Sequence, residues 1–600
     1  MALLIDGLII LLYFVAITSI GLYMGRREKS LHDFALGGRN VPWWAVMASI
    51  IAAETSAATF IGAPGEGFKA RSVVYGQLVI GLILGRIAVG FWFLKPYYTY
   101  KVYTVYDYLG VRFGARSKNY VAALFLVMRT LASGARVFVP ALVMVVAWQA
   151  LKSDGKVVFT QQGFGLAPYV VAILLITILT CLYTAVGGIK AVIWTDVIQA
   201  SIMFGSAIVA IITILYHIGG DSWNLGNGFH ALAEAAPKMR THEGYFLFGW
   251  ESSVVDPWKA ARGIDHMTAW EWLRLTFASE FTLWSATIGA IFTNMAAFGT
   301  DQDMVQRLLT AETYQKSRRS LITAAFMDLP IACGFAFIGV LLVAFYQQQP
   351  AHKPPDNADV FGSYIVNVMP IGVRGIVLAG VFATAMGSLS AALNALATSF
   401  TNDWYIPYLA KGRSEHHYVS AARFLTAIFA ILMIAIAVGS AYVKVTNPDF
   451  RIIPFVIGIA GLFLGPMLGV FLIGMFTRQR GSDAGNMLAI TLGLVGIFFI
   501  SGQHVEVANI LRPVPRGQTP IYKLPEWFPV VKWPWFAMFG ACITFTVGML
   551  FRTPQHVLTA ARAKAEQARG GDERPMAIRG TAPVVDGFPI DTATSRQGGH

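Results

Sequence analysis

The stretch from Ala52 to Gly65, with the sequence AAETSAATFIGAPG, constrains this chain more than any other. It lies in an apolar run from about 41 to 63, which is long enough to cross a bilayer. The middle of that run holds a carboxylate, Glu54, and the hydroxyls of Thr55, Ser56 and Thr59. Polar side chains at membrane depth are costly, and the run ends in glycine and proline. The pattern predicts a helix that opens at the bilayer midplane to bind an ion or a solute.

The rest of the chain has the composition of a polytopic membrane protein. Of its 600 residues, 56% are hydrophobic and only 13% are charged, and the mean hydropathy is +0.57, which is too apolar for a soluble domain of this size. Apolar runs of 18 residues or more recur along the chain. We expect an all-α protein with about thirteen transmembrane helices, at 3–24, 41–63, 74–96, 119–150, 166–188, 192–217, 272–298, 320–346, 371–400, 421–442, 452–476, 484–502 and 533–551.

Basic residues predict how the chain is oriented. They gather in the loops after the first, third, seventh and eleventh spans, which lie on one side if the N-terminus is outside. This pattern explains the net charge of +13 better than nucleic-acid binding does. The sequence thus predicts a cell-membrane protein, of the bacterial inner membrane, with its C-terminus in the cytoplasm. The first run is interpreted as a retained helix, the loop 218–271 as an outer cap, and residues from about 560 as a disordered tail.

The ninth predicted span has a second polar stretch, from Thr384 to Asn394. Thr384 and Ser388 are four residues apart and therefore share a helix face. Hydroxyls and freed backbone carbonyls are hard oxygen ligands that suit a small cation. Small residues here are also compatible with simple helix packing, but two such stretches in one bundle favour an ion site.

Arg136 is the clearest indication of the solute. It lies in the middle of a predicted span, where an unpaired cation is expensive. A guanidinium can grip a carboxylate through two parallel hydrogen bonds. The alternative is an internal ion pair with Glu54 or Glu280, and Arg129, on the same face, is a second candidate for such pairing.

Five motifs in order resemble the sodium:solute symporter family, which transports sugars, proline, sialic acids, monocarboxylates and iodide with sodium. They are ALGGRNVPWW (35–44), AVGGIKAVIWTDVIQ (185–199), GTDQDMVQRLL (299–309), the ninth-span stretch with NDWY (402–405), and GPMLGVFLIGMFT (465–477). The resemblance implies a LeuT-type core of two inverted five-helix repeats, with the second and seventh spans broken. The implied division is an extra helix in 1–30, a core at 31–480 with repeats at about 41–217 and 272–476, extra helices in 481–551, and a cytoplasmic tail at 552–600.

The resemblance also implies a sodium site between the second and ninth spans. Its ligands would be carbonyls of Ala52, Thr55 and Thr384 and the hydroxyl of Ser388. Gly387 stands where the family often has a hydroxyl, so it offers only a carbonyl. Together with Ala391, it argues against a further sodium near Ser390, and we expect one sodium per cycle. Asp196 matches an acidic residue near the inner sodium route, although a helix N-terminal carboxylate is an alternative.

By the same positions, the solute pocket is expected to include Ser56, Thr59 and Gln77, with Glu280 and Asn294 as weaker candidates. Sialic-acid-type members use an arginine on the helix of Arg136 to bind the carboxylate. Glu54 matches a position that is acidic in proline-type members, where it would attract the cation, pair with an arginine or hold a proton.

These expectations point to a sodium-coupled importer of a small organic solute, and Arg136 favours a carboxylate such as a sialic acid, a monocarboxylate or an amino acid. A neutral sugar or polyol, and proton coupling through Glu54, are alternatives. The motifs of membrane enzymes are not found in the sequence, which predicts that the chain is not an enzyme. We expect it to act as a monomer in the bilayer, with sodium and the solute as its small-molecule partners.

Overall fold

The structure, a computed structural model, describes residues 2–25, 30–152, 165–239, 266–280, 282–354, 360–446, 452–511, 522–525 and 531–569, together with residues 259 and 528. Within these ranges the chain forms helices and turns, with two isolated β-bridges. The prediction of an all-α fold is confirmed.

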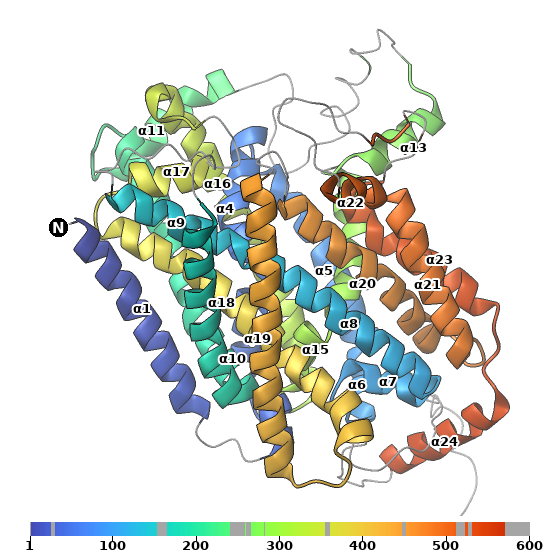
Figure 1. The fold of residues 1–600 in the computed structure, drawn as a ribbon. Helices are drawn as coiled ribbons and strands as arrows, with labels where there is room; N and C mark the ends of the chain where they lie inside the picture. Colours follow the sequence, from blue (N-terminus) through green and yellow to red (C-terminus); the bar gives the residue numbers. More distant parts are fainter. Residues whose placement is uncertain are drawn as a thin grey trace, which may run out of the picture.

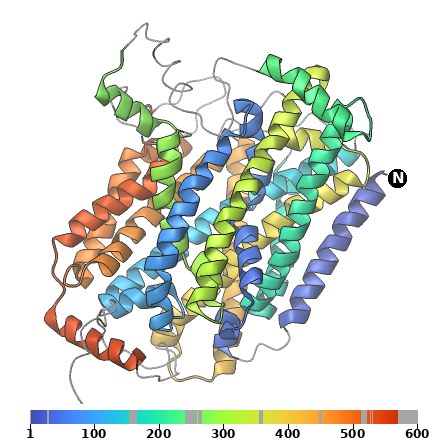
Figure 2. The ribbon, with the colours of Figure 1, turned by 180° about the vertical axis from the view of Figure 1, so that it is seen from behind.

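The helices lie side by side in one bundle, with shorter helices at its two ends (Figure 1; the reverse side is in Figure 2). The first half of the chain contributes α1 (Ala2–Met24), α2 (Leu31–Leu36), α3 (Trp43–Glu54), α4 (Ala57–Ala70), α5 (Leu78–Trp92), α6 (Leu94–Thr99), α7 (Val105–Arg112), α8 (Ala115–Arg136), α9 (Phe138–Lys152), α10 (Leu166–Ile218) and α11 (Leu225–Met239). The second half contributes α13 (Ala269–Ala278), α14 (Ala290–Gly299), α15 (Gln302–Leu309), α16 (Tyr314–Gln348), α17 (Val360–Asn367), α18 (Val373–Phe400), α19 (Glu415–Thr446), α20 (Ile452–Phe476), α21 (Asp483–Ile500), α22 (Gln503–Leu511), α23 (Phe536–Met549) and α24 (Gln555–Arg569).

The membrane-spanning helices of the described residues can be compared with the thirteen predicted spans. In the described ranges, nine helices are long and apolar enough to span a bilayer, or ten if the bent pair α3 and α4 is one span. The predicted spans 166–188 and 192–217 are joined in the single helix α10, which bends at Gly188 with φ 53° and ψ −154°. The predicted span 272–298 is divided among α13, the π-helix Ser285–Gly289 and α14, and α23 belongs to a shorter apolar helix. The count of thirteen is thus not confirmed.

The break between α3 and α4 lies in the stretch that the sequence singled out. The two helices meet at an angle of 65°. Thr55 has extended backbone, with φ −76° and ψ 98°, and ends α3. Ser56 caps the N-terminus of α4, where its hydroxyl accepts a hydrogen bond from the backbone N–H of Thr59 at 3.3 Å. A serine that caps a new helix in the middle of a span therefore opens it, as predicted.

The helix α18 lies at the centre of the bundle, and α1 lies at its edge (Figure 1). In the most apolar 18-residue window of each span, 89% of the residues are buried in the span that contains α18, but only 28% are buried in α1. Small residues make this centre compact: Gly380 of α18 lies so close to α10 that an added Cβ would be 2.3 Å from the hydroxyl of Ser206. The break between α3 and α4 therefore faces a tightly packed helix.

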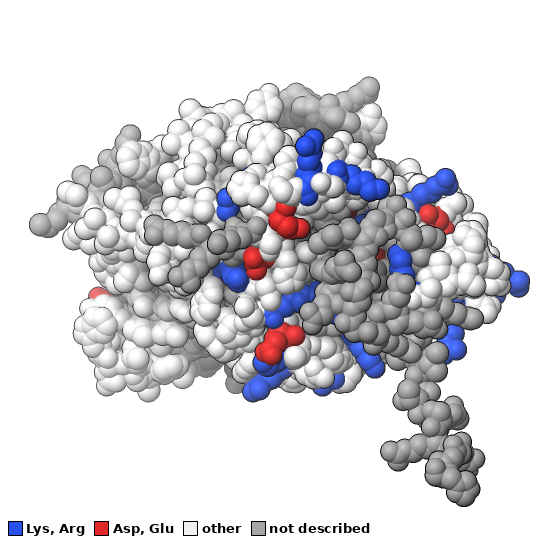
Figure 3. All heavy atoms as spheres, turned by 90° about the horizontal axis from the view of Figure 1, so that it is seen from below, with Lys and Arg blue, Asp and Glu red and all other residues white. Residues whose placement is uncertain are grey.

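One end of the bundle carries many basic side chains. Lysine and arginine side chains lie over the end that is lowest in Figure 1 and faces the viewer in Figure 3. The described part of α24 lies at this end, where residues 555–569 form a helix although disorder was expected from about residue 560. The rest of the expected tail, and residues 240–258 and 260–265 of the expected outer cap, lie outside the described residues.

Candidate sodium and solute sites

Three oxygen atoms meet beside Gly387 on α18. A Cβ added to Gly387 would lie 2.9 Å from Oε1 of Gln199, 3.4 Å from Oδ1 of Asp196 and 3.6 Å from the carbonyl oxygen of Ala52. Asp196 and Gln199 are on α10, with exposed fractions of 0% and 1%, and Ala52 is at the end of α3. Because Gly387 has no side chain, oxygen atoms of α3 and α10 can lie close together beside α18.

Two of these oxygens have no donor among the described residues. Both Asp196 Oδ1 and Gln199 Oε1 are buried there without a hydrogen-bond partner. The Nε2 group of Gln199 donates to Tyr13 at 3.4 Å, which directs the amide oxygen the other way. Buried acceptors without donors are uncommon, and a cation or a water molecule satisfies them. The gap beside Gly387 is therefore chemically suited to a cation that prefers oxygen ligands.

The other oxygen of Asp196 is tied into a buried network. Oδ2 accepts hydrogen bonds from Ser49 at 2.6 Å and from Arg307 at 3.2 Å. Arg307 also pairs with Asp303 at 2.7 Å, and Asp303 pairs with Arg129 at 3.2 Å. Asp196 lies well inside α10, so its role as a helix N-terminal carboxylate is excluded. The network connects α3, α8, α10 and α15 and fixes Oδ1 toward Gly387.

Two hydroxyls on α18 make local hydrogen bonds: that of Ser388, which was expected to bind sodium, and that of Thr384, whose carbonyl was expected to do so. Thr384 donates to the carbonyl of Val381 at 2.8 Å, and Ser388 donates to that of Ala385 at 3.1 Å. Each lies on α18, and the lone pairs of both hydroxyls stay available because each donates its proton to the backbone. Thr55 is 6% exposed at the break. The structure thus brings Ala52, Gly387 and Asp196 together, whereas in the described residues no hydrogen bond joins Thr384 to the break.

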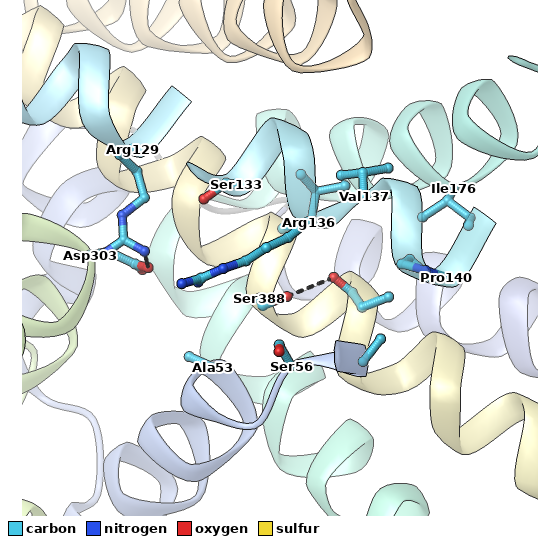
Figure 4. Close-up of a pocket in the computed structure, with 13 residues that line it drawn as sticks. Ala53, Ser56, Arg129, Ser133, Arg136, Val137, Pro140, Ile176, Asp303 and Ser388 are labelled. Atoms are coloured by element: carbon cyan, nitrogen blue, oxygen red, sulfur yellow. Dashed lines mark hydrogen bonds and ion pairs between the residues drawn. The ribbon is translucent and has the colours of Figure 1, made fainter. Parts of the chain in front are cut away.

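The guanidinium of Arg136 extends into the space between α18 and the break (Figure 4). It lines a small cavity of about 20 Å³ with Ser56, Ser133, Asp303 and Ser388. In the described part of the chain, no hydrogen bond or ion pair to this guanidinium is observed, whereas Arg129 pairs with both Asp301 and Asp303. Internal pairing therefore falls to Arg129, as the sequence allowed, and Arg136 is left facing the cavity.

A proline places Arg136 at the end of α8. Pro140 lies four residues after Arg136 and has no N–H to bond its carbonyl. The helix is accordingly interrupted at Val137, between α8 and α9. The bend turns the end of α8 toward α18, which is where the side chain reaches the cavity.

A larger cavity of about 320 Å³ adjoins the same arginine. Glu54, Thr55, Thr59, Asn294 and Arg136 are among its lining residues. Gln77, which was expected to face the solute, is buried in the short helix Val74–Gln77 and does not line either cavity, although its neighbours Tyr75 and Leu78 do.

Glu54 pairs with Arg86, which is one of the three roles that the sequence left open for it. Nη2 of Arg86 contacts Glu54 and, at 2.7 Å, Asp328 of α16. Asp328, Gln199, Asp301 and Asp303 were not predicted as site residues. Asp301 and Asp303 lie in the GTDQDMVQRLL motif and Gln199 lies in WTDVIQ, so the motifs could have indicated these three. Asp328 lies in no motif.

The comparisons with known proteins bear on this arrangement. The family model described as "Sodium:solute symporter family" matches residues 34–493. The chain belongs to the sodium:solute symporter family. Curated relatives include the sodium/sialic acid symporter SiaT of Proteus mirabilis, 27% identical over 81% of this chain and 87% of the relative, and the sodium/glucose cotransporter of Vibrio parahaemolyticus, 26% identical over 82% and 84%.

A solved structure has the same fold. It is a Na+-coupled sialic acid symporter in a substrate-bound, outward-open state, with a TM-score of 0.69, 24% identity, and coverage of 91% of this chain and 97% of the other. The LeuT-type fold expected from the sequence is confirmed. The protein is a sodium-coupled symporter of a small solute in a membrane and not an enzyme.

Proposed function

We propose that this symporter imports a small carboxylate, of the sialic acid type, with sodium. The observation that carries this proposal is the guanidinium of Arg136, which faces two adjoining cavities and has no partner in the described residues. A buried cation without a counter-charge is costly, and a bound carboxylate removes that cost through two charge-assisted hydrogen bonds. Two of the related proteins are sodium/sialic acid symporters, which agrees with such a solute.

Around the carboxylate, hydroxyls supply neutral hydrogen-bonding groups. Ser56, Ser133 and Ser388 line the small cavity with Arg136, and Thr59 and Asn294 line the large one. Serine and threonine hydroxyls both donate and accept, which suits the hydroxyls of a sugar-like body. A neutral sugar is the second candidate, because a sodium/glucose cotransporter is also among the relatives, and a neutral solute would not need the charge of Arg136.

The proposed sodium site lies between the break and α18. Its ligands are the carbonyl of Ala52, Oδ1 of Asp196 and, in place of the hydroxyl missing at Gly387, Oε1 of Gln199. The carbonyls of Thr55 and Thr384 and the hydroxyl of Ser388 complete the set expected from the family. A cation in this gap would hold α3 against α18 and α10, and would thereby fix the wall that Ser56 and Ser388 form for the solute. Sodium and solute then favour the same conformation, which is the condition for coupling.

The basic end in Figure 3 is proposed to be cytoplasmic, so that the N-terminus is outside and α24 is inside the cell. We propose a core at 31–480, flanked by extra helices, and a monomer in the inner membrane.

Uptake into liposomes tests the proposed solute. Purified protein would be reconstituted, and uptake of a sialic acid, lactate, pyruvate, proline and glucose would be followed with an inward sodium gradient. Carboxylate uptake that falls at least thirtyfold in Arg136→Gln is expected, because truncating one partner of a buried charge pair costs about 2 kcal/mol or more. Arg318→Gln, near the start of α16, is the matched control and should retain uptake, because Arg318 lies over the ring of Phe91 and lines neither cavity. Uptake of glucose alone, unchanged in Arg136→Gln, would refute the proposal.

A further inference from the structure

The large cavity is lined by two kinds of side chain. Its polar groups include the guanidinium of Arg136 and the amide of Asn294. Its apolar surface includes Leu82 of α5, Leu464 of α20 and Trp533, which begins the short helix Trp533–Trp535 just before α23. A charged group alone cannot cover both kinds of surface, so a solute that fills this cavity also needs an apolar part.

The segment that carries Trp533 is fixed at the cavity wall. The carbonyl oxygen of Pro534 accepts a hydrogen bond from the hydroxyl of Thr293 on α14 at 3.3 Å. A Cβ added to Gly289 would lie 2.7 Å from the same carbonyl, so the lack of a side chain there permits this close approach. Trp535 is 3% exposed and anchors the other end of the segment. Trp533 itself is half-buried, and it therefore lines the cavity from a fixed position.

A flat indole ring is suited to one kind of solute. A sugar ring has an apolar face, because its C–H bonds point to the two sides of the ring while most of its hydroxyls lie around the edge. The face of an aromatic ring offers a large apolar area with partial negative charge, which attracts such C–H groups. We propose that Trp533 binds the ring of the solute while Arg136 binds its carboxylate, so that the solute is a sugar acid. This inference rests on the proposed function, because it takes the carboxylate on Arg136 as given.

The size of the cavity also favours a sugar acid over a small monocarboxylate. Its volume of about 320 Å³ lies in the usual range for ligand pockets, about 300–1,000 Å³. A solute as small as lactate, bound on Arg136, would leave the apolar surface of Leu82, Leu464 and Trp533 in contact with water, which is unfavourable. A sugar acid has both the charge for the guanidinium and the ring for this surface.

Trp533 lies outside the part of the chain that the family match describes. The family model matches residues 34–493, so the segment before α23 is beyond it. Leu82 and Leu464, in contrast, lie within the matched residues. The proposed contact would thus add to the common core a recognition residue from the helices that follow it.

Calorimetry on the purified full-length protein in sodium tests the contact. A sialic acid, which is a sugar acid, and lactate, which has no ring, would be titrated into each variant. We expect Trp533→Ala to bind the sialic acid about tenfold more weakly or worse, because truncation of a tryptophan at a binding site is among the costliest. Trp533→Phe keeps a flat apolar ring and should retain most of the affinity. The matched control is Trp223→Ala, since Trp223 is 79% exposed and lines neither cavity.

Two readouts separate a ring contact from a structural role. The sodium midpoint of thermal stabilisation should be the same in Trp533→Ala and in the wild type, and lactate that binds should lose no affinity in this variant. Equally tight binding of the sialic acid in Trp533→Ala would overturn the proposal. An equal loss of affinity for lactate and the sialic acid would also overturn it, because the change would then act through Arg136. If Trp533→Ala does not fold, Trp533→Leu decides, since it keeps an apolar side chain and removes the ring.

Failure of this inference and failure of the proposed function give different results. Binding of lactate or pyruvate without binding of the sialic acid would contradict the sugar acid and leave the carboxylate on Arg136 intact. Binding of glucose alone, weakened in Trp533→Ala but not in Arg136→Gln, would contradict the proposed carboxylate and support Trp533 as the ring contact.

Discussion

Replacing Gly387 with alanine should weaken sodium binding, because the new methyl group would occupy the gap among the three oxygens. The added Cβ would lie 2.9 Å from Oε1 of Gln199, closer than such contacts are found, and 3.4 Å from Oδ1 of Asp196. The amide of Gln199 is the flexible partner, so it would turn away and be lost as a ligand. An interaction of a dipole with a charged group is worth about 1.5–3 kcal/mol, which corresponds to a loss of about tenfold to a hundredfold in sodium affinity.

Sodium-dependent thermal stability measures this loss without knowledge of the solute. A cation that binds only the folded protein stabilises it by RT ln(1 + [Na+]/Kd), so each tenfold rise in Kd removes about 1.4 kcal/mol of stabilisation at saturating sodium. Unfolding would be followed over a sodium titration, with choline to hold the ionic strength constant. Gln199→Leu, which removes the same oxygen, should shift the midpoint in the same direction.

The control is Gly439→Ala, because a Cβ at Gly439 of α19 would meet nothing within 4 Å. It should leave the sodium midpoint where it is in the wild type. If Gly387→Ala and Gln199→Leu also leave the midpoint unchanged, the three oxygens do not form the sodium site and the reasoning is refuted.

Two further substitutions test how the fold supports the sites. Arg129→Gln leaves the buried carboxylate of Asp301 without its partner and should lower the free energy of unfolding by about 3–5 kcal/mol. The double variant with Asp301→Asn should recover most of the thermal stability. An undiminished melting temperature in the single variant would argue against the pair. Gly188→Ala forces a side chain into backbone geometry that essentially only glycine adopts, and its Cβ would lie 2.7 Å from the carbonyl oxygen of Phe34. It should lower the free energy of unfolding by at least about 1–3 kcal/mol in the same assay. The control is Gly205→Ala on the same helix, where a Cβ meets nothing within 4 Å, and equal melting temperatures for the two variants would contradict this account of the bend.

The break in the second predicted span could be foreseen because its cause is local. Glu54, Thr55 and Ser56 follow one another in the sequence, and a serine is a strong helix N-cap. The bend in α10 was harder to predict from the sequence. The helix continues on both sides of Gly188, although the φ of this glycine is positive. The boundary between two predicted spans was therefore a kink rather than a loop.

The partners of the charged residues could not be foreseen in the same way. Arg86, Glu54 and Asp328 come from three helices that are far apart in the sequence, and only the packing of α3, α5 and α16 brings them together. The same holds for Gln199, which faces Gly387 across α10 and α18. A sequence marks a polar residue inside a span as important, but its partner depends on tertiary structure.

Binding of a sialic acid to the purified protein, measured in sodium and in choline for the wild type and for Arg136→Lys, tests the central claim most directly. The account predicts sodium-dependent binding in the wild type and a large loss in Arg136→Lys, because an ammonium cannot replace the two-point grip of a guanidinium. Binding that is equally tight in Arg136→Lys, or equally tight without sodium, would contradict the claim that Arg136 and the sodium site together select the solute.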